Sequence, residues 1–404
     1  KTSIEKIEFP EDSELISIES GAISNSSINS IMIPKNVRKL EDGWCGLARN
    51  LNNLTISPSN DNFTYLNADK KVIIGKSNSN STIYDELVFA NRDIKEAIIP
   101  PYIRTINSYA FSSCTKIKTI KFEDNSLLEK IGDCAFYNSN ITNIDIPINV
   151  REIGKLCFTF CFSLKKVSFP KNSQLTSIGE NAFEQSMIEE IILPEKLHQI
   201  KEKTFNFCRN LRSIQFPKNS ETLKIIRKSA FENTSLFSIK IPSYIEKIEE
   251  SAFYNCRNLE IVEFSENSKL QSIEKCVFQD TSITTIKIPS NVKSIENFSF
   301  SNCRNLNEIT FSEDSELVSI DSNAFSSSQL QKFSIPSKVK DLREGWCNNL
   351  PFLSKISVSP KNNRFLCLGE KILLGKTDVN CEVYDILVFA CRDLQKISIP
   401  SFVR

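Results

Sequence analysis

The chain has 404 residues, and its 50 Lys and Arg residues nearly balance its 49 Asp and Glu residues, which leaves a net charge of +1. Near-neutrality argues against a nucleic-acid or membrane-surface binder, because both need concentrated positive charge. No run of about 18 apolar residues occurs, so nothing in this segment is predicted to enter a bilayer. The phosphate-binding motifs GxGxxG and GxxxxGK[ST] are also missing from the sequence.

The first predicted elements are repeat units over residues 1–45, followed by a different segment over residues 46–90. Within this segment, NFTYLNADKKVIIG (62–75) reads as two short strands around a polar turn. Such a pattern is typical of a β-hairpin. We therefore predict an inserted hairpin, called an island here, that lies across the repeat array.

Residues 91–347 carry the regular repeat, which is marked by a Phe in a fixed register. Successive register positions are 22 or 25–26 residues apart, at Phe111, Phe136, Phe158, Phe183, Phe205, Phe231, Phe253, Phe278, Phe300 and Phe325. Two unit types therefore alternate, with a combined period of about 47 residues. A fixed period of this kind indicates a solenoid.

Each unit is predicted to form two short strands and a turn. Pairs such as Ile144/Ile146 and Ile214/Phe216 alternate at period 2, as in a strand with one buried face, and the Pro that usually follows ends the strand. The segment Val150 to Ile153 begins a second wall, and we expect a helical or 3₁₀ turn at the Ala-Phe step. Because one unit cannot bury its own apolar face, the units must stack. The predicted fold is a β-rich α/β solenoid of alternating coils of about 22 and 25 residues.

A longer period relates the two ends of the chain. EDGWCGL (41–47) matches REGWCNNL (343–350), and Tyr84 and Tyr384 stand 300 residues apart in similar segments. We therefore predict a second island over residues 348–390 and the start of a further repeat block over residues 391–404. Because Arg404 aligns with Arg104, where regular coils resume, we expect the array to continue in a longer protein.

The units PINVREIGKLCFTFC (147–161) and PSYIEKIEESAFYNC (242–256) resemble the BspA-like leucine-rich repeats of bacterial and protist surface proteins. The islands LVFANRD and LVFACRD look like those of the protist, trichomonad-like branch. This resemblance implies a cell-surface or secreted adhesion protein or antigen that contacts host matrix or cells, with no catalytic residues and no cofactor. One departure is that Gly follows the second-wall Ile only at Gly132, Gly154 and Gly179, so elsewhere that turn must accept a side chain.

Five of the thirteen Cys residues follow the register Phe by three positions: Cys114, Cys161, Cys208, Cys256 and Cys303. Coils stack about 4.8 Å apart, and successive cysteines of this set are two coils apart, so neighbouring cysteines would lie roughly 9–10 Å from each other. This exceeds the Cα separation of about 7 Å that a disulfide allows. We predict a structural ladder of buried free thiols. A Cys367–Cys381 disulfide inside the second island is an open alternative.

No catalytic or metal site can be assembled from the sequence. His198 is the only histidine and occupies a variable, solvent-facing position, and no CxxC motif occurs. Candidate binding residues lie between the apolar positions of the strands, at Lys121, Asp145, Gln215, Lys240, Glu263 and Lys287. These positions mix charges, so they are either a plain solvated face or a broad protein-binding surface. Trp44 and Trp346, at the entry to each island, are either binding hot spots or packed under the hairpin.

Two functions follow from these observations. The first is a non-catalytic surface protein that binds host proteins, with end-to-end self-association through its terminal coils as an additional mode. The second is an intracellular scaffold of the same fold in the cytoplasm, which buried free thiols favour because reducing compartments keep thiols reduced.

Overall fold

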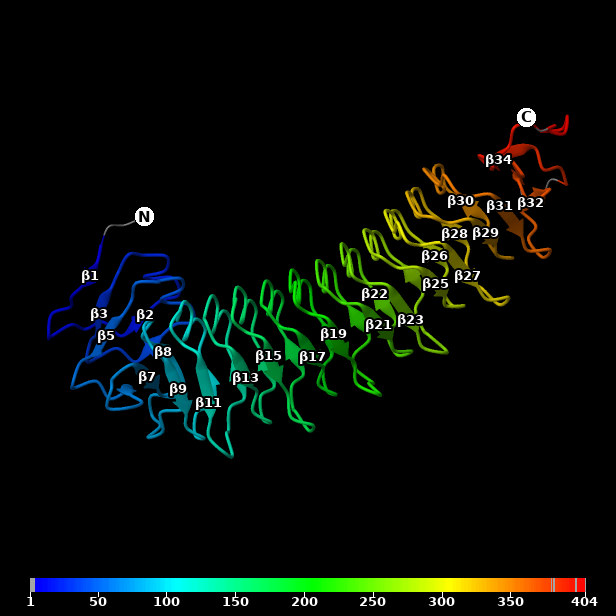
Figure 1. The fold of residues 1–404 in the computed structure, drawn as a ribbon. Coiled ribbons are helices and arrows are strands. Elements are labelled where there is room, and N and C mark those ends of the chain that lie inside the picture. Colours follow the sequence, from blue (N-terminus) through cyan, green and yellow to red (C-terminus); the bar gives the residue numbers. More distant parts are fainter. Residues whose placement is uncertain (1–3, 379, 381, 397, 404) are drawn as a thin grey trace. The chain divides into compact units, whose positions relative to one another are not determined.

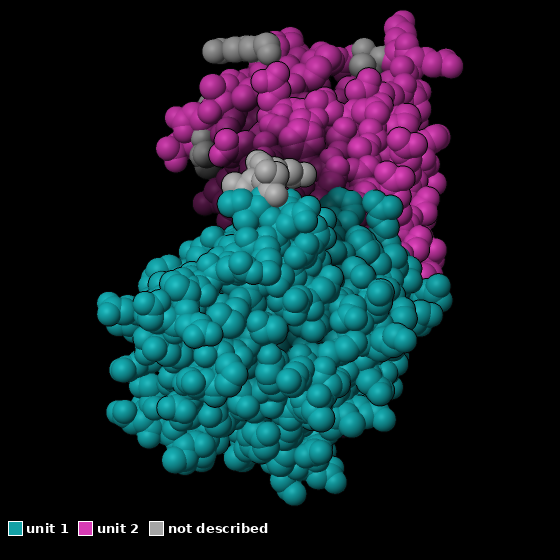
Figure 2. Space-filling model, turned by 90° about the vertical axis from the view of Figure 1, so that its left-hand side faces the viewer, with its two compact units in different colours: residues 1–217 teal, residues 218–404 magenta. Residues whose placement is uncertain are grey.

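The computed structural model describes residues 4–378, 380, 382–396 and 398–403. The chain divides into two compact units, residues 1–217 and residues 218–404, which we describe separately (Figure 2). In both units, consecutive coils place their short strands side by side, as Figure 1 shows. Each coil contributes a longer strand to a first wall and a two-residue strand to a second wall.

Unit 1 holds two walls of parallel strands. The first wall comprises β1 (Lys6–Ile7), β3 (Ser30–Ile33), β5 (Asn53–Ile56), β9 (Glu96–Ile99), β11 (Thr119–Phe122), β13 (Asn143–Asp145), β15 (Lys166–Ser168), β17 (Glu190–Ile192) and β19 (Ser213–Gln215). The second wall comprises β2 (Ser17–Ile18), β4 (Lys39–Leu40), β10 (Thr105–Ile106), β12 (Lys130–Ile131), β14 (Glu152–Ile153), β16 (Ser177–Ile178) and β18 (Gln199–Ile200). The strands β6 (Phe63–Tyr65), β7 (Val72–Gly75) and β8 (Glu86–Ala90) form the antiparallel part.

Unit 2 repeats this arrangement. Its first wall comprises β21 (Ser238–Ile241), β23 (Ile261–Phe264), β25 (Thr285–Ile288), β27 (Glu308–Phe311), β29 (Lys332–Ile335) and β31 (Lys355–Val358). Its second wall comprises β20 (Ile225–Ile226), β22 (Lys247–Ile248), β24 (Ser272–Ile273), β26 (Ser294–Ile295), β28 (Ser319–Ile320) and β30 (Asp341–Leu342). The antiparallel strands are β32 (Phe365–Leu368), β33 (Ile372–Gly375) and β34 (Ile386–Ala390).

Equivalent side chains of neighbouring coils lie on top of one another, which confirms a solenoid of stacked coils within each unit. In the second wall, Ile131 pairs with Ile153, and Ile153 pairs with Ile178. The register Phe rings form a buried column: Phe136 and Phe158 stack with centroids 5.2 Å apart, and so do Phe158 and Phe183. The core of each unit is therefore a set of columns that run from coil to coil.

The helical turn expected at the Ala-Phe step is wrong, because the described residues contain no helix. In the turn of residues 107–114, Tyr109 and Ser113 adopt positive φ angles of 62° and 59°. A right-handed helix needs negative φ at every residue, so these two positions exclude it. The N–H groups of Tyr109 and Phe111 instead donate to carbonyl oxygens of the next coil, Asp133 O at 3.0 Å and Ala135 O at 2.7 Å. Stacking therefore replaces helical hydrogen bonds, and the fold is a β-solenoid without an α component in the part described.

The antiparallel strands lie in the segments that the sequence marks as islands. In unit 1, β6 pairs with β7 and β7 pairs with β8, so three strands are present where two were expected. The third strand, β8, belongs both to the antiparallel sheet and to the second wall, because it pairs with β7 on one side and in parallel with β10 on the other. The hairpin is thereby joined to the ladder of coils.

One buried Asn in each unit fixes the chain before the hairpin. The amide of Asn60 donates to Pro34 O at 2.7 Å and to Val37 O at 2.9 Å, and its Oδ1 accepts from the N–H groups of Asn62 and Phe63. Asn362 makes the equivalent four bonds in unit 2. Sequence reasoning missed both residues, although their equivalent places in the long period were a usable signal.

Candidate binding surface

The first-wall strands place alternate side chains outside the coil. In β25, Thr285 and Lys287 are exposed, whereas Ile286 and Ile288 are buried. Because successive side chains of a strand point to opposite faces, every coil adds the same kind of outward position to the wall. The parallel pairing lines these positions up into rows.

All six candidate residues from the sequence lie on this outward side. Lys121, Asp145 and Gln215 are exposed in unit 1, and Lys240, Glu263 and Lys287 are exposed in unit 2. The register places Lys240 directly opposite Glu263, so these two form an adjacent pair of opposite charge. Lys121 instead stands opposite Ile98, and Asp145 stands opposite Ser168.

Two shallow grooves run over the outer first wall of unit 2. The first crosses β21, β23 and β25, reaches the turn that follows β27, and is lined by Lys240, Glu263, Phe264 and Lys287, among other residues. The second crosses β27, β29 and β31, where the turn between β32 and β33 brings Glu370 to 3.0 Å from the ammonium group of Lys355. Sequence reasoning had singled out the charged positions but missed the half-buried Phe264.

The five cysteines of the ladder are buried, and their thiols face backbone groups. The Sγ atom of Cys208 lies 3.0 Å from Phe183 O, and Cys256 and Cys303 reach the carbonyl oxygens of Phe231 and Phe278 at the same distance. Burial raises the pKa of Cys161, Cys208 and Cys303 to about 12, and that of Cys114 and Cys256 to about 11. The protonated thiols are therefore hydrogen-bond donors. Cys381, the second partner of the alternative disulfide, lies outside the described residues.

Comparison with known families agrees with this coil geometry. A family model described as "BspA type Leucine rich repeat region (6 copies)" matches residues 1–70, 81–212, 176–290 and 224–354. The chain belongs to the BspA-type leucine-rich-repeat family. The matches span both units, and the protist branch has no separate support. A search among curated proteins finds no match.

Three solved structures are similar to this BspA-type chain. A leucine-rich repeat protein from Bacteroides ovatus is 22% identical with a TM-score of 0.42, and the match covers 74% of this chain and 98% of that one. A leucine-rich cell surface protein from Faecalibacterium prausnitzii is 22% identical with a TM-score of 0.35, covering 74% and 92%. The pneumococcal vaccine antigen PcpA is 19% identical with a TM-score of 0.44, covering 75% and 83%.

Both tryptophans lie in the interior of their BspA-type units. Trp44 is 2% exposed and Trp346 is 3% exposed. Each indole packs against a Phe of the strand that ends its island, with ring centroids 6.2 Å apart for Trp44–Phe89 and for Trp346–Phe389. The two side chains therefore fill space beside the hairpins and contribute no exposed surface.

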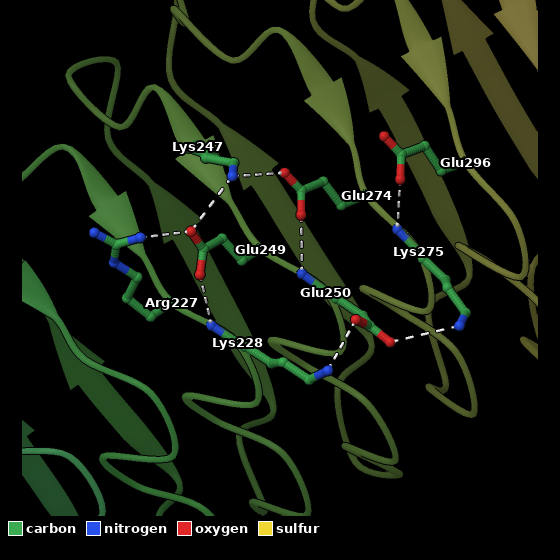
Figure 3. A network of polar contacts seen from close by, with 8 residues as sticks. All are labelled: Arg227, Lys228, Lys247, Glu249, Glu250, Glu274, Lys275 and Glu296. Atoms are coloured by element: carbon green, nitrogen blue, oxygen red, sulfur yellow. Dashed lines mark hydrogen bonds and ion pairs between the residues drawn. The ribbon is translucent and has the colours of Figure 1, made fainter.

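A polar network explains how BspA-type coils of unit 2 do without the second-wall Gly. In unit 1 a Cβ at Gly154 would lie 2.5 Å from Asp133 N, so that turn is tightly packed. In three coils of unit 2 the position is held by Glu249, Glu274 and Glu296, whose carboxylates accept the backbone N–H groups of Lys228, Glu250 and Lys275 in the coils before (Figure 3). Arg227 and Lys247 add ion pairs to Glu249 at 2.8 and 3.4 Å.

Arg92 is a buried residue that sequence reasoning missed. It is 4% exposed, and its Nη1 donates to Ala110 O at 3.1 Å and to Tyr109 O at 3.3 Å in the following coil. Its guanidinium lies 4.5 Å from the ring centroid of Phe89. The side chain therefore ties the end of the island to the next BspA-type coil. The repetition of this Arg in both LVFANRD and LVFACRD could have indicated its structural role from the sequence.

Among residues 4–378, 380, 382–396 and 398–403, no group of three His, Cys, Asp or Glu side chains is placed to hold a metal ion. His198 is exposed on its coil. Over the same part of the chain, no helix is long and apolar enough to cross a membrane.

Proposed function

We propose that the chain is a non-catalytic repeat protein of the cell surface, an adhesin or antigen that binds host matrix or cell-surface proteins through its outer first wall. The observation that carries this proposal is that each coil has an inner and an outer set of side chains. The register Phe, Ile and Cys side chains form the buried columns, so a partner can contact only the outward rows. The grooves of unit 2 offer charged groups beside partly buried rings, a combination that suits protein partners.

A binding experiment tests the proposed face. The full chain is applied to immobilised matrix proteins and to epithelial cells, beside a variant that carries Lys240→Glu and Glu263→Lys. A control variant carries Lys171→Glu and Glu195→Lys, two exposed turn positions of unit 1, with the same net charge. We expect the groove variant to lose at least tenfold in affinity and the control to bind like the parent. Equal binding by all three proteins would reject the groove.

The second candidate is an intracellular scaffold, and the buried free thiols favour it. The two candidates differ in location, so antibodies against the chain separate them. Labelling of intact cells of the source organism supports the surface protein. Labelling that requires permeabilised cells supports the scaffold and defeats the adhesin.

End-to-end pairing of two chains is a further proposed mode of association. The first coil of unit 1 exposes Ile4 (51%) and Ile16 (62%), and the last residues of unit 2 expose Ile399 (45%) and Phe402 (47%). Exposed apolar side chains of this kind favour stacking on a coil of another chain. Light scattering over a range of concentrations should show association that Ile16→Lys abolishes and Ile192→Lys, an exposed position within the wall, leaves unchanged. A monomer at all concentrations contradicts this mode.

A further inference from the structure

A set of lysines gathers on the outer first wall of unit 1. Five exposed lysines lie in or directly before β9, β11 and β15: Lys95, Lys118, Lys121, Lys165 and Lys166. We call this set the basic face. At the corresponding positions of β9 to β15, only Glu96 and Asp145 carry negative charge. Among the described residues, the one ion pair of the set joins Lys165 to Glu189 at 3.6 Å.

Backbone pairing sets three of these lysines in a straight row. The residue before each first-wall strand donates its N–H to the equivalent residue of the preceding coil, from Lys118 to Lys95 O at 2.9 Å, then from Thr142 to Lys118 O, and from Lys165 to Thr142 O. The row continues through Glu189 to Arg212. Since neighbouring strands lie about 4.8 Å apart, it extends over about 24 Å from Lys95 to Arg212.

The corresponding row of unit 2 carries no cation. It runs through Phe237, Glu260, Thr284 and Asn307, joined by the same kind of backbone bond, and Gln331 and Ser354 follow in the same register. The repeat architecture therefore does not require a basic side chain at this position. Lys95 and Lys118 are neighbours in the row of unit 1, and like charges about 5 Å apart repel one another, so this pair favours an anion that lies along the row.

We propose that the basic face of unit 1 binds a linear sulfated polysaccharide. The charges are spaced along a line, which matches a polymer with repeated anionic groups better than a compact anion. Between the lysines lie Thr119, Asn143 and Ser168, whose polar groups suit sugar hydroxyls. This partner is of a different class from the protein ligand proposed above, and the inference does not depend on that proposal.

The other polyanions fit the face less well. Single-stranded nucleic acid is held by aromatic side chains on which bases stack, whereas the strands β9, β11, β13 and β15 hold one aromatic residue, Phe122, which is half-buried. An acidic protein segment would normally add buried apolar anchors, and within the first-wall strands β9, β11, β13 and β15 the sole exposed large apolar side chain is Ile98. Lys side chains are compact, flexible point charges, which suits binding by charge along a polymer.

The test uses the full chain and immobilised heparin as the probe, with affinity measured over a range of salt concentrations. One variant carries Lys95→Gln, Lys118→Gln and Lys165→Gln. The matched control carries Lys240→Gln, Lys287→Gln and Lys332→Gln, which removes the same charge from exposed first-wall positions of unit 2. Circular dichroism checks that both variants fold.

We expect the first variant to bind heparin at least tenfold more weakly, with the slope of log affinity against log salt reduced by about two to three, since fewer counterions are released. The control should bind like the parent chain. Equal losses in both variants, or no loss in either, would overturn the proposal. Poly-glutamate or oligo-thymidine binding as tightly as heparin, with the same sensitivity to the first variant, would show that the class of partner is wrong.

Discussion

The column of Phe rings gives the sharpest prediction for stability. Phe158 is fully buried, and its ring stacks on Phe136 at an interplanar angle of 4° and on Phe183 at 1°. Replacing a buried Phe with Ala costs about 3–5 kcal/mol, and each aromatic pair contributes about 0.5–1.5 kcal/mol to such a site. Because both faces of the ring are covered, Phe158→Ala should destabilise its part of unit 1 by about 4 kcal/mol.

Hydrogen exchange is the suitable assay, because long repeat arrays need not unfold in one step. A loss of about 4 kcal/mol should speed the exchange of protected amides in coils 130–185 by up to about 1000-fold. Phe162→Ala is the control, since this side chain is 52% exposed and contacts the Phe160 ring at 5.8 Å. Its cost should stay below about 1 kcal/mol. Similar effects of the two substitutions would refute the column as the core of the coil.

Three further predictions concern buried polar groups. The ladder thiols should resist a thiol reagent at pH 8 in the native chain, because burial raises their pKa. After denaturation, most of the thirteen cysteines should react as free thiols, and the finding of six disulfides would contradict this prediction. Cys208→Val should cost about 0.5–1.5 kcal/mol, since Phe183 O loses one of its two donors and keeps the N–H of Ser186, and Cys208→Ser should cost clearly less in urea unfolding. Burial, and after it the negative charge of Glu274, raises the pKa of Glu296. The stability that the protonated Glu296 side chain contributes is therefore fully present below the ordinary Glu pKa, and it is lost as the pH rises through the raised pKa. Glu296→Gln should therefore raise the midpoint of unfolding in urea at pH 7 but not at pH 3. Glu249→Gln is the control: it weakens the ion pairs to Arg227 and Lys247, so it should lower this midpoint at pH 7.

Much of the fold was predictable from periodicity alone. The Phe register and the Ile-x-Ile triplets predicted most of the buried side chains, because a strand exposes alternate residues and stacked coils repeat the same positions. The exception is the Phe at the second triplet position of the longer coils, such as Phe264, which is half-buried. The ladder cysteines followed from the same register. The limits of the repeat blocks and islands, at residues 45/46, 90/91, 347/348 and 390/391, stay predictions.

Several features depend on contacts between segments that are distant in sequence, and only the tertiary structure determined them. The turn at the Ala-Phe step is not helical, because its N–H groups find acceptors in the next coil, for instance Phe111 N at Ala135 O. Trp44 is interior because a hairpin distant in sequence covers it, and Arg92 is buried because the next coil supplies its carbonyl acceptors. The basic row appears only after coils about 23–25 residues long are laid side by side, since Lys95, Lys118 and Lys165 are neighbours through stacking and not through sequence. The periodic sequence thus determines which way each side chain faces, and contacts between coils determine which side chains meet.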